Sequence, residues 1–155
     1  MCRTDNTSRI EYSLKRNVKA VYRLVNSERL SLMPANRVLC VEDDADTRDM
    51  LKTKLGLSDF DVVVAPDMEA ALRLMERERF GLYVLDGGLR GIKGQSLCEQ
   101  IRASDTSTPI VIFSGHASTS DIEAAMLAGA NAYLVKPDSS ELIPTIRRLL
   151  EAAAG

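Results

Sequence analysis

Residues 38–44 read VLCVEDD, a continuous apolar run that ends in three consecutive acidic residues. A short apolar run without alternation is typical of a strand buried on both faces, as in a parallel sheet covered by helices. Residues 46–57 follow with apolar side chains at helical spacing, and Asp46 is a candidate N-cap for that helix. The stretch therefore predicts the opening strand and helix of an α/β domain.

The same alternation continues along the rest of the chain. The pattern predicts four more strands and four more helices, the strands over 60–65, 81–85, 109–113 and 132–135, and the helices around 68–75, around 97–101, over 120–128 and over 139–153. Gly129 is placed to stop the fourth helix. Five such β/α units predict one doubly wound parallel α/β domain.

Residues 1–35 do not share this rhythm, and we expect an N-terminal extension followed by the α/β domain over 36–153. The extension has apolar residues at spacings of three and four, which allow a basic amphipathic helix for docking a partner or a membrane surface. The alternatives are an appendage without such a role or a non-native upstream start. Residues 1–32 carry seven Lys and Arg against three Asp and Glu, whereas residues 33–155 carry thirteen against nineteen. Acidic chemistry is therefore expected in the second part.

Composition narrows the class of protein further. The chain has 155 residues, 45% hydrophobic and 27% charged, with a formal net charge of -2, which gives no sign of a nucleic-acid or anionic-membrane partner. Cys2, Cys40 and Cys98 are scattered and show no metal or disulfide spacing. No apolar stretch approaches the roughly 20 residues of a membrane span, and no signal core is visible. We expect a soluble cytoplasmic domain with reduced cysteines.

Chemically active side chains follow four of the five predicted strands. Glu42, Asp43 and Asp44 follow the first strand, Asp86 the third, Ser114 the fourth and Lys136 the fifth. Each alone would be an ordinary turn, cap or loop residue. In a doubly wound sheet, however, the carboxyl ends of the strands meet at one edge, where ligands bind.

The joint placement of these side chains therefore predicts a site. Carboxylates held together repel one another, and Mg²⁺ relieves that repulsion with oxygen ligands. Asp86 could then attack a phosphoryl group, while Lys136 pairs with the developing charge and Ser114 donates a hydrogen bond.

Four stretches resemble the response-regulator receiver domains of two-component signalling, and the resemblance covers residues 36–152. They are residues 38–44, the sequence VLD at 84–86 with Gly94 eight residues on, PIVIFSG at 109–115, and AGANAYLVKP at 128–137. The resemblance implies a flavodoxin-like sheet with strand order 2-1-3-4-5. It also implies a cis peptide bond between Lys136 and Pro137.

The resemblance assigns a role to each site residue. Asp86 would be the phosphoacceptor, with Ser114 and Lys136 in contact with the phosphoryl group. Asp43, Asp86 and the backbone carbonyl of Gly88 would hold Mg²⁺, and Glu42 would complete the acidic pocket through a water. Tyr133 would reorient when Ser114 moves. Gly88 and His116, two residues after the acceptor and the hydroxyl, would tune the rate of dephosphorylation.

Two positions depart from the family pattern in the loop after the acceptor. Arg90 stands where proline is usual, and glycines at 87, 88 and 91 lower the rigidity of the loop. Lys93 adds a positive charge where the family often has an acidic residue. These departures bear on the affinity for Mg²⁺ more than on the identity of the phosphoacceptor.

The interpretation is a stand-alone receiver, similar to chemotaxis regulators, that accepts a phosphoryl group from a histidine kinase or a phosphotransfer protein. Because the chain ends just after the fifth helix, we expect no DNA-binding domain and an output through a downstream protein. Two alternatives stay open: a degenerate receiver used as a passive scaffold, and an aspartate-based phosphohydrolase. The second is disfavoured because Gly88 stands where such an enzyme needs an acid/base aspartate. We therefore expect a switch rather than an enzyme acting on outside substrates.

Overall fold

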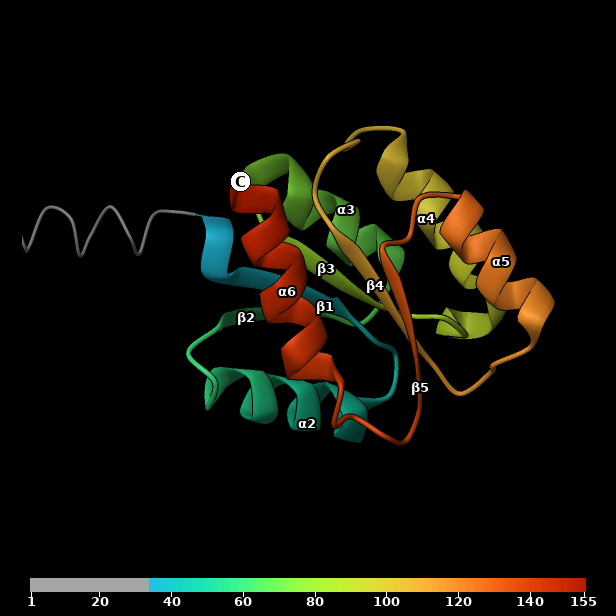
Figure 1. The fold of residues 1–155 in the computed structure, drawn as a ribbon, viewed down its shortest axis with the longest axis horizontal. Helices are drawn as coiled ribbons and strands as arrows, with labels where there is room; N and C mark the ends of the chain where they lie inside the picture. The colour runs from blue at the N-terminus through green and yellow to red at the C-terminus, as the bar shows by residue number, and fades with distance from the viewer. Residues whose placement is uncertain (1–33) are drawn as a thin grey trace, which may run out of the picture. The chain divides into compact units, whose positions relative to one another are not determined.

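The computed structural model describes residues 34–155, which are built on a five-stranded parallel sheet (Figure 1). The strand order is β2-β1-β3-β4-β5, which confirms the predicted fold class and order. The elements in chain order are η1 (Pro34–Asn36), β1 (Arg37–Val41), α2 (Ala45–Gly56), β2 (Asp61–Ala65), α3 (Met68–Arg77), β3 (Leu82–Asp86), η2 (Leu89–Gly91), α4 (Gly94–Arg102), β4 (Ile110–Ser114), α5 (Thr119–Leu127), β5 (Ala132–Val135) and α6 (Leu142–Ala154).

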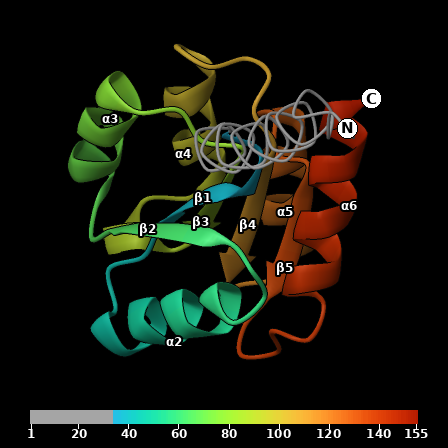
Figure 2. The ribbon, with the colours of Figure 1, turned by 90° about the vertical axis from the view of Figure 1, so that its left-hand side faces the viewer.

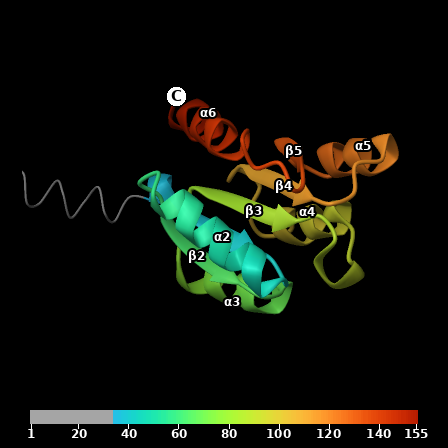
Figure 3. The ribbon, with the colours of Figure 1, turned by 90° about the horizontal axis from the view of Figure 1, so that it is seen from below.

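The central strands are buried on both faces because helices cover the sheet from both sides. Every residue of β3 and β4 is buried, as the unbroken apolar runs in the sequence predict. Neighbouring residues of a strand point to opposite faces, so Cys40 packs with α2 and α6, while Leu39 packs with the cluster that includes α3, α4 and α5. Figure 2 shows the sheet between these helical layers, and Figure 3 shows α4 and α5 side by side.

Two helix starts differ from the sequence prediction. Asp44, not Asp46, caps α2, because Asp44 has extended backbone dihedrals and its carboxylate accepts the Thr47 amide at 2.8 Å. Asp46 is the second residue of the helix, so it does not occupy the N-cap position. The last helix begins at Leu142 rather than near 139, because the Asp138 carboxylate accepts the Ser140 amide at 2.8 Å and forms a turn there.

The other helix ends follow the sequence signals. Ser118 caps α5 by accepting the Asp121 amide, and Gly129 follows that helix with a φ of 113°, a value that glycine adopts without strain. The predicted amphipathic helix of the N-terminal extension lies outside the described residues. Over residues 34–155, no helix is both long enough and apolar enough to cross a membrane.

Cys40 and Cys98 are buried free thiols. Burial raises the pKa of the Cys40 thiol to about 12 and that of the Cys98 thiol to about 11. Both thiols therefore stay protonated at neutral pH, and both side chains pack as small apolar groups, as the sequence predicts.

Candidate functional site

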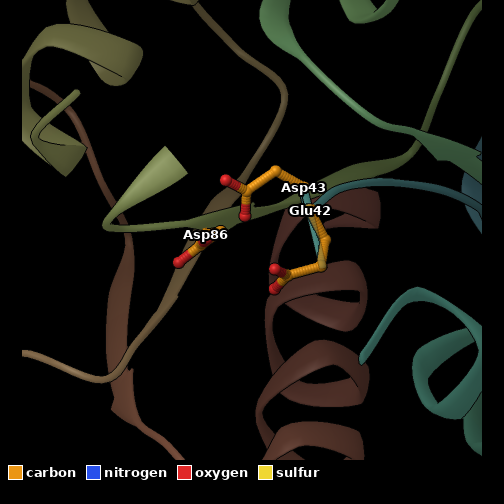
Figure 4. Close-up of side chains that lie close together, drawn as sticks. All are labelled: Glu42, Asp43 and Asp86. Carbon is orange, nitrogen blue, oxygen red and sulfur yellow. The ribbon is translucent and has the colours of Figure 1, made fainter. Parts of the chain in front are cut away.

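Three carboxylates lie together at the carboxyl ends of β1 and β3. The two strands are neighbours in register, with Val41 opposite Leu85, so Glu42 and Asp86 come next on adjacent strands. One oxygen from each of Glu42, Asp43 and Asp86 lies within 4.8 Å of the other two. Figure 4 shows the three carboxyl groups close together. Glu42 is only 1% exposed and Asp86 8% exposed, whereas Asp43 is open to solvent.

Lys136, directly after β5, reaches two of these carboxylates. Its Nζ lies 2.6 Å from Glu42 Oε2 and 3.2 Å from Asp86 Oδ1. Its position is fixed by the sheet, because the Lys136 amide donates to the Ser114 carbonyl at 2.8 Å. The Lys136–Pro137 peptide bond is cis, as expected from the family resemblance.

Burial and charge pairing have opposite effects on the pKa values of Glu42 and Lys136. Burial raises the pKa of Glu42, and the hydrogen bond from Lys136 only partly offsets that effect. Burial disfavours the charge of Lys136, but the hydrogen bond to Glu42 and the charge of Asp86 outweigh it and raise the pKa of Lys136. The ammonium is therefore charged at neutral pH.

Asp43 is held from the loop after Asp86. Its Oδ2 accepts the Arg90 amide at 3.1 Å. Slight burial raises the pKa of Asp43. The hydrogen bond from the Arg90 amide, together with further hydrogen bonds to nearby groups, outweighs this effect and lowers the pKa below its usual value. Arg48, in the first turns of α2, donates from one nitrogen to the Glu42 carbonyl at 2.9 Å and to the Asp43 carbonyl at 2.8 Å. Arg48 thereby fixes the backbone that carries both acidic side chains.

Ser114 ends β4 next to the loop that follows Asp86. It is fully buried, and its Oγ accepts the His116 amide at 3.1 Å. A Cβ built on Gly87 would lie 2.7 Å from that oxygen, so Ser114 and Gly87 are in close contact. The Tyr133 hydroxyl donates to the His116 carbonyl at 2.6 Å, which connects the aromatic side chain to the same segment.

Gly88 contacts both Asp86 and the segment that follows Ser114. Its amide donates to Asp86 Oδ1 at 3.0 Å, and its carbonyl accepts the Gly91 amide at 3.1 Å within η2. A carbonyl oxygen has two lone pairs, so one remains for a ligand. A Cβ built on Gly88 would lie 3.7 Å from the His116 ring, so these two predicted tuning positions do lie side by side.

A pocket of roughly 520 Å³ opens beside Gly87 and Gly88. His116, Tyr133 and the start of α5 line its other side. Lys93 also lines the pocket, and its Nζ lies 3.3 Å from Oδ1 of Asp121 of α5. The glycine-rich loop after Asp86 therefore borders open space on one side.

The donor set fits Mg²⁺. All of the clustered groups are carboxylates, the hard oxygen ligands that Mg²⁺ prefers. Three carboxylates and one ammonium leave a formal charge of -2, which a divalent cation balances. Asp43 and Asp86 would hold the ion directly, and buried Glu42 is placed behind them for an indirect role.

The structure brings Glu42, Asp43, Asp86 and Lys136 together at the strand ends, whereas Asp44 caps α2 and is not part of the cluster. It also adds two residues that the sequence did not single out for this purpose. Arg48 and the Arg90 amide both act on the Glu42–Asp43 segment. Arg48 lies six residues after Glu42, on the helix that leaves the site, so its spacing could have suggested the contact. The Arg90 amide gives no such signal, since a backbone donor cannot be read from side-chain identity.

The family model that matches this chain is that of the response regulator receiver domain, over residues 38–147. The transcriptional regulatory protein PrrA of Mycobacterium tuberculosis is 38% identical over 115 residues, which are 74% of this chain and 49% of that protein. The probable transcriptional regulator ycf27 of Porphyridium aerugineum is 34% identical over 119 residues, which are 76% of this chain and 49% of that protein.

Solved structures agree with the sequence relatives. A CheY-like response regulator receiver domain protein from Methanospirillum hungatei superposes with a TM-score of 0.72 at 28% identity, covering 77% of this chain and 96% of that one. The response regulator TrrA of Thermotoga maritima, solved in complex with Mg²⁺-BeF, gives a TM-score of 0.66 at 27% identity, covering 74% and 98%.

One expectation is wrong. The sequence predicted an output through a downstream protein and no DNA-binding domain, because the chain ends after its last helix. Curated relatives are named as transcriptional regulators, and this chain spans about half of their length. The end of the given chain is therefore no argument against a DNA-binding output.

The receiver-domain model covers more than two thirds of the chain, and the sheet order and the strand-end carboxylates agree with it. The chain belongs to the response regulator receiver domain family of two-component signalling.

Proposed function

We propose that the domain is a phosphorylation-dependent switch in which Asp86 accepts a phosphoryl group in a Mg²⁺-dependent reaction. The observation that carries this proposal is the cluster of Glu42, Asp43 and Asp86, with the ammonium of Lys136 between two of them. The donor would be a phosphohistidine on a sensor histidine kinase or on a phosphotransfer protein. The membership of the receiver family supports this choice of donor.

In the proposed transfer, a carboxylate oxygen of Asp86 forms the new bond to phosphorus. The phosphorus–nitrogen bond of the donor breaks at the same time, and its electron pair stays on the imidazole. The Gly88 amide donates to Oδ1 of Asp86, and the Lys136 ammonium forms an ion pair with the same oxygen. Together these contacts orient the carboxylate for attack through its other oxygen. Lys136 would then pair with the negative charge on the phosphoryl oxygens, and Ser114 would donate to one of them.

Asp43 and Asp86, with the Gly88 carbonyl as a further ligand, would hold Mg²⁺, whose charge would offset that of the carboxylates and the phosphoryl group. Glu42 would stay hydrogen-bonded to Lys136 and act on the ion through a water. This division of roles follows burial: Glu42 is enclosed behind Lys136, whereas Asp43 is open to the solvent from which the ion arrives.

The signal would leave the site through Ser114. To bond a phosphoryl oxygen, its hydroxyl has to turn toward Asp86, and the bond it now accepts from the His116 amide would change. The carbonyl of His116 holds the Tyr133 hydroxyl, so that movement would reach Tyr133. His116 and Gly88 would line the path of the water that later hydrolyses the phosphoaspartate.

Curated relatives are regulators by name, which supports a switch over an enzyme that acts on outside substrates. The position of Gly88 supports the same choice, because glycine offers no acid or base to a leaving group. We infer further that the signal serves control of transcription, as the names of those relatives suggest.

The test is Mg²⁺-dependent labelling by a small phosphodonor. The chain is incubated with acetyl phosphate, with Mg²⁺ or with a chelator, and its intact mass is measured. One added phosphoryl group that requires Mg²⁺ is expected. No labelling under either condition would leave a passive scaffold as the better description, and continuous phosphate release from small phosphoesters would favour a hydrolase.

A further inference from the structure

Arg90 has a backbone conformation that residues other than glycine seldom adopt. Its φ is 48° and its ψ is 35°, and Gly91 follows with a φ of 78°. An L-residue in this left-handed region costs free energy relative to its usual conformations. Such a residue persists when its surroundings hold it, so the contacts of Arg90 are informative.

Two contacts hold Arg90, and both lead to acidic residues at the same edge of the sheet. Its amide donates to Asp43 Oδ2 at 3.1 Å, across 47 positions of sequence. Its guanidinium lies 3.6 Å from the carboxylate of Asp67, the residue that caps α3. The loop after the acceptor is therefore tied to both neighbouring turns.

The bond to Asp43 opposes a repulsion. The carboxylate of Asp43 is open to solvent on one side and faces the carboxylates of Glu42 and Asp86 on the other. Like charges at this distance repel, and an exposed aspartate is free to rotate away from them. The Arg90 amide donates a hydrogen bond to the Asp43 side chain in the conformer that points toward Asp86. This bond keeps the Asp43 carboxylate beside Asp86.

We propose that the Arg90 backbone amide positions Asp43 as a ligand for a divalent cation at Asp86. The inference rests on the proposed Mg²⁺-dependent function and assigns to it a residue that departs from the family pattern. Hydrogen bonds that orient a ligand from behind commonly set metal affinity. Proline, usual at this position in related domains, has no amide hydrogen and a φ fixed near -65°, so it could form neither the bond nor this turn.

The amide is the active part of Arg90, rather than its charge. The guanidinium is directed to Asp67, and 62% of the side chain is exposed. A charge placed there is largely screened by water and salt. Two substitutions separate these contributions: Arg90→Asn removes the charge but keeps the amide and tolerates the left-handed conformation, whereas Arg90→Pro removes charge and amide together.

The experiment is a calorimetric Mg²⁺ titration of the full chain without phosphodonor, for the wild type and both variants. We expect Arg90→Asn to bind within about threefold of the wild type and Arg90→Pro to bind at least about tenfold more weakly than Arg90→Asn. Equal affinities of the two variants would overturn this inference alone. A wild type that binds no Mg²⁺ would overturn the proposed function, and this inference with it.

A second measurement on the wild type guards against a proline variant that fails to fold. Amide hydrogen exchange at Arg90 is followed by NMR with and without Mg²⁺, and again in Asp43→Ala. We expect protection that persists or increases with Mg²⁺ and is lost in Asp43→Ala. Faster exchange on adding Mg²⁺ would mean that the ion competes with the amide for Asp43, which contradicts the positioning role.

Discussion

Gly87, the residue after Asp86, has no room for a side chain. A Cβ at this position would lie 2.6 Å from Ser114 Cβ, 2.7 Å from Ser114 Oγ and 2.9 Å from Ile112 Cγ2. Ser114 and Ile112 are both fully buried, so neither has a free end that can move aside cheaply. At the next residue, by contrast, a Cβ on Gly88 would meet its nearest neighbour, the His116 ring, at 3.7 Å.

We predict opposite outcomes for alanine at these two adjacent glycines. Gly87→Ala forces a shift of the loop or of Ser114, and overpacking of this kind typically costs about 1–3 kcal/mol in the free energy of unfolding. It should also slow the proposed phosphorylation at least about tenfold, because it displaces the Ser114 hydroxyl, which in the proposed mechanism donates to a phosphoryl oxygen. Gly88→Ala meets only ordinary contacts. It should be neutral or stabilise the fold by roughly 0.4–1 kcal/mol, because alanine lowers the conformational entropy of the unfolded chain.

Urea unfolding followed by circular dichroism gives the stabilities, and the rate of mass gain with acetyl phosphate gives the reactivity. The adjacent substitution is the matched control, since both variants add the same methyl group to the same loop. The steric reasoning fails if Gly87→Ala matches Gly88→Ala in both measurements. A Gly87→Ala variant that is destabilised but reacts at the wild-type rate would show that the loop, not Ser114, absorbs the clash.

Three further predictions concern charge, acid stability and signal lifetime. Lys136→Gln removes the ammonium between two carboxylates and should lower the labelling rate by at least about tenfold while Mg²⁺ still binds; an unchanged rate would exclude its role. Partial burial raises the pKa of the Asp105 carboxyl, but hydrogen bonds from the Thr108 amide and the Tyr83 hydroxyl outweigh it and lower this pKa to about 2. Because the pKa of Asp105 is lower in the folded than in the unfolded chain, its ionised carboxylate stabilises the fold at pH values above the unfolded-state pKa. Near neutral pH, Asp105→Asn should therefore lower the free energy of unfolding by roughly 1–2 kcal/mol. In urea titrations this gap should close as the pH falls from about 4 toward 2, and a gap independent of pH would contradict it. His116→Ala should change the dephosphorylation rate about threefold or more, and identical phosphate loss would make His116 a bystander.

Most of the fold was predictable because the apolar pattern of a buried parallel sheet is unambiguous. Runs such as residues 81–85 and 109–113 have no polar interruption, and each is followed by a helical spacing. The exact start of a helix was harder to predict where two neighbouring residues could both cap it. Asp44 and Asp46 are both good capping residues, and the choice between them depends on where the chain leaves β1, which the local sequence does not determine.

The site was predictable to the extent that side chains at strand ends determine it. Glu42, Asp86 and Lys136 meet because parallel strands place their carboxyl ends at one edge. The contacts of Arg48 and Arg90 were not predictable in the same way. They run to backbone carbonyls or from a backbone amide, and the Arg90 bond depends on a left-handed turn that only the folded loop defines.

The proposed role of Asp86 as phosphoacceptor is decided by the intact mass of the wild type measured beside that of Asp86→Asn. Asparagine keeps the shape of the side chain but removes the nucleophilic carboxylate, and a matched circular dichroism spectrum would confirm that the fold is kept. With acetyl phosphate and Mg²⁺, we predict one added phosphoryl group on the wild type and none on Asp86→Asn. Undiminished labelling of a folded Asp86→Asn variant would mean that Asp86 is not the phosphoacceptor.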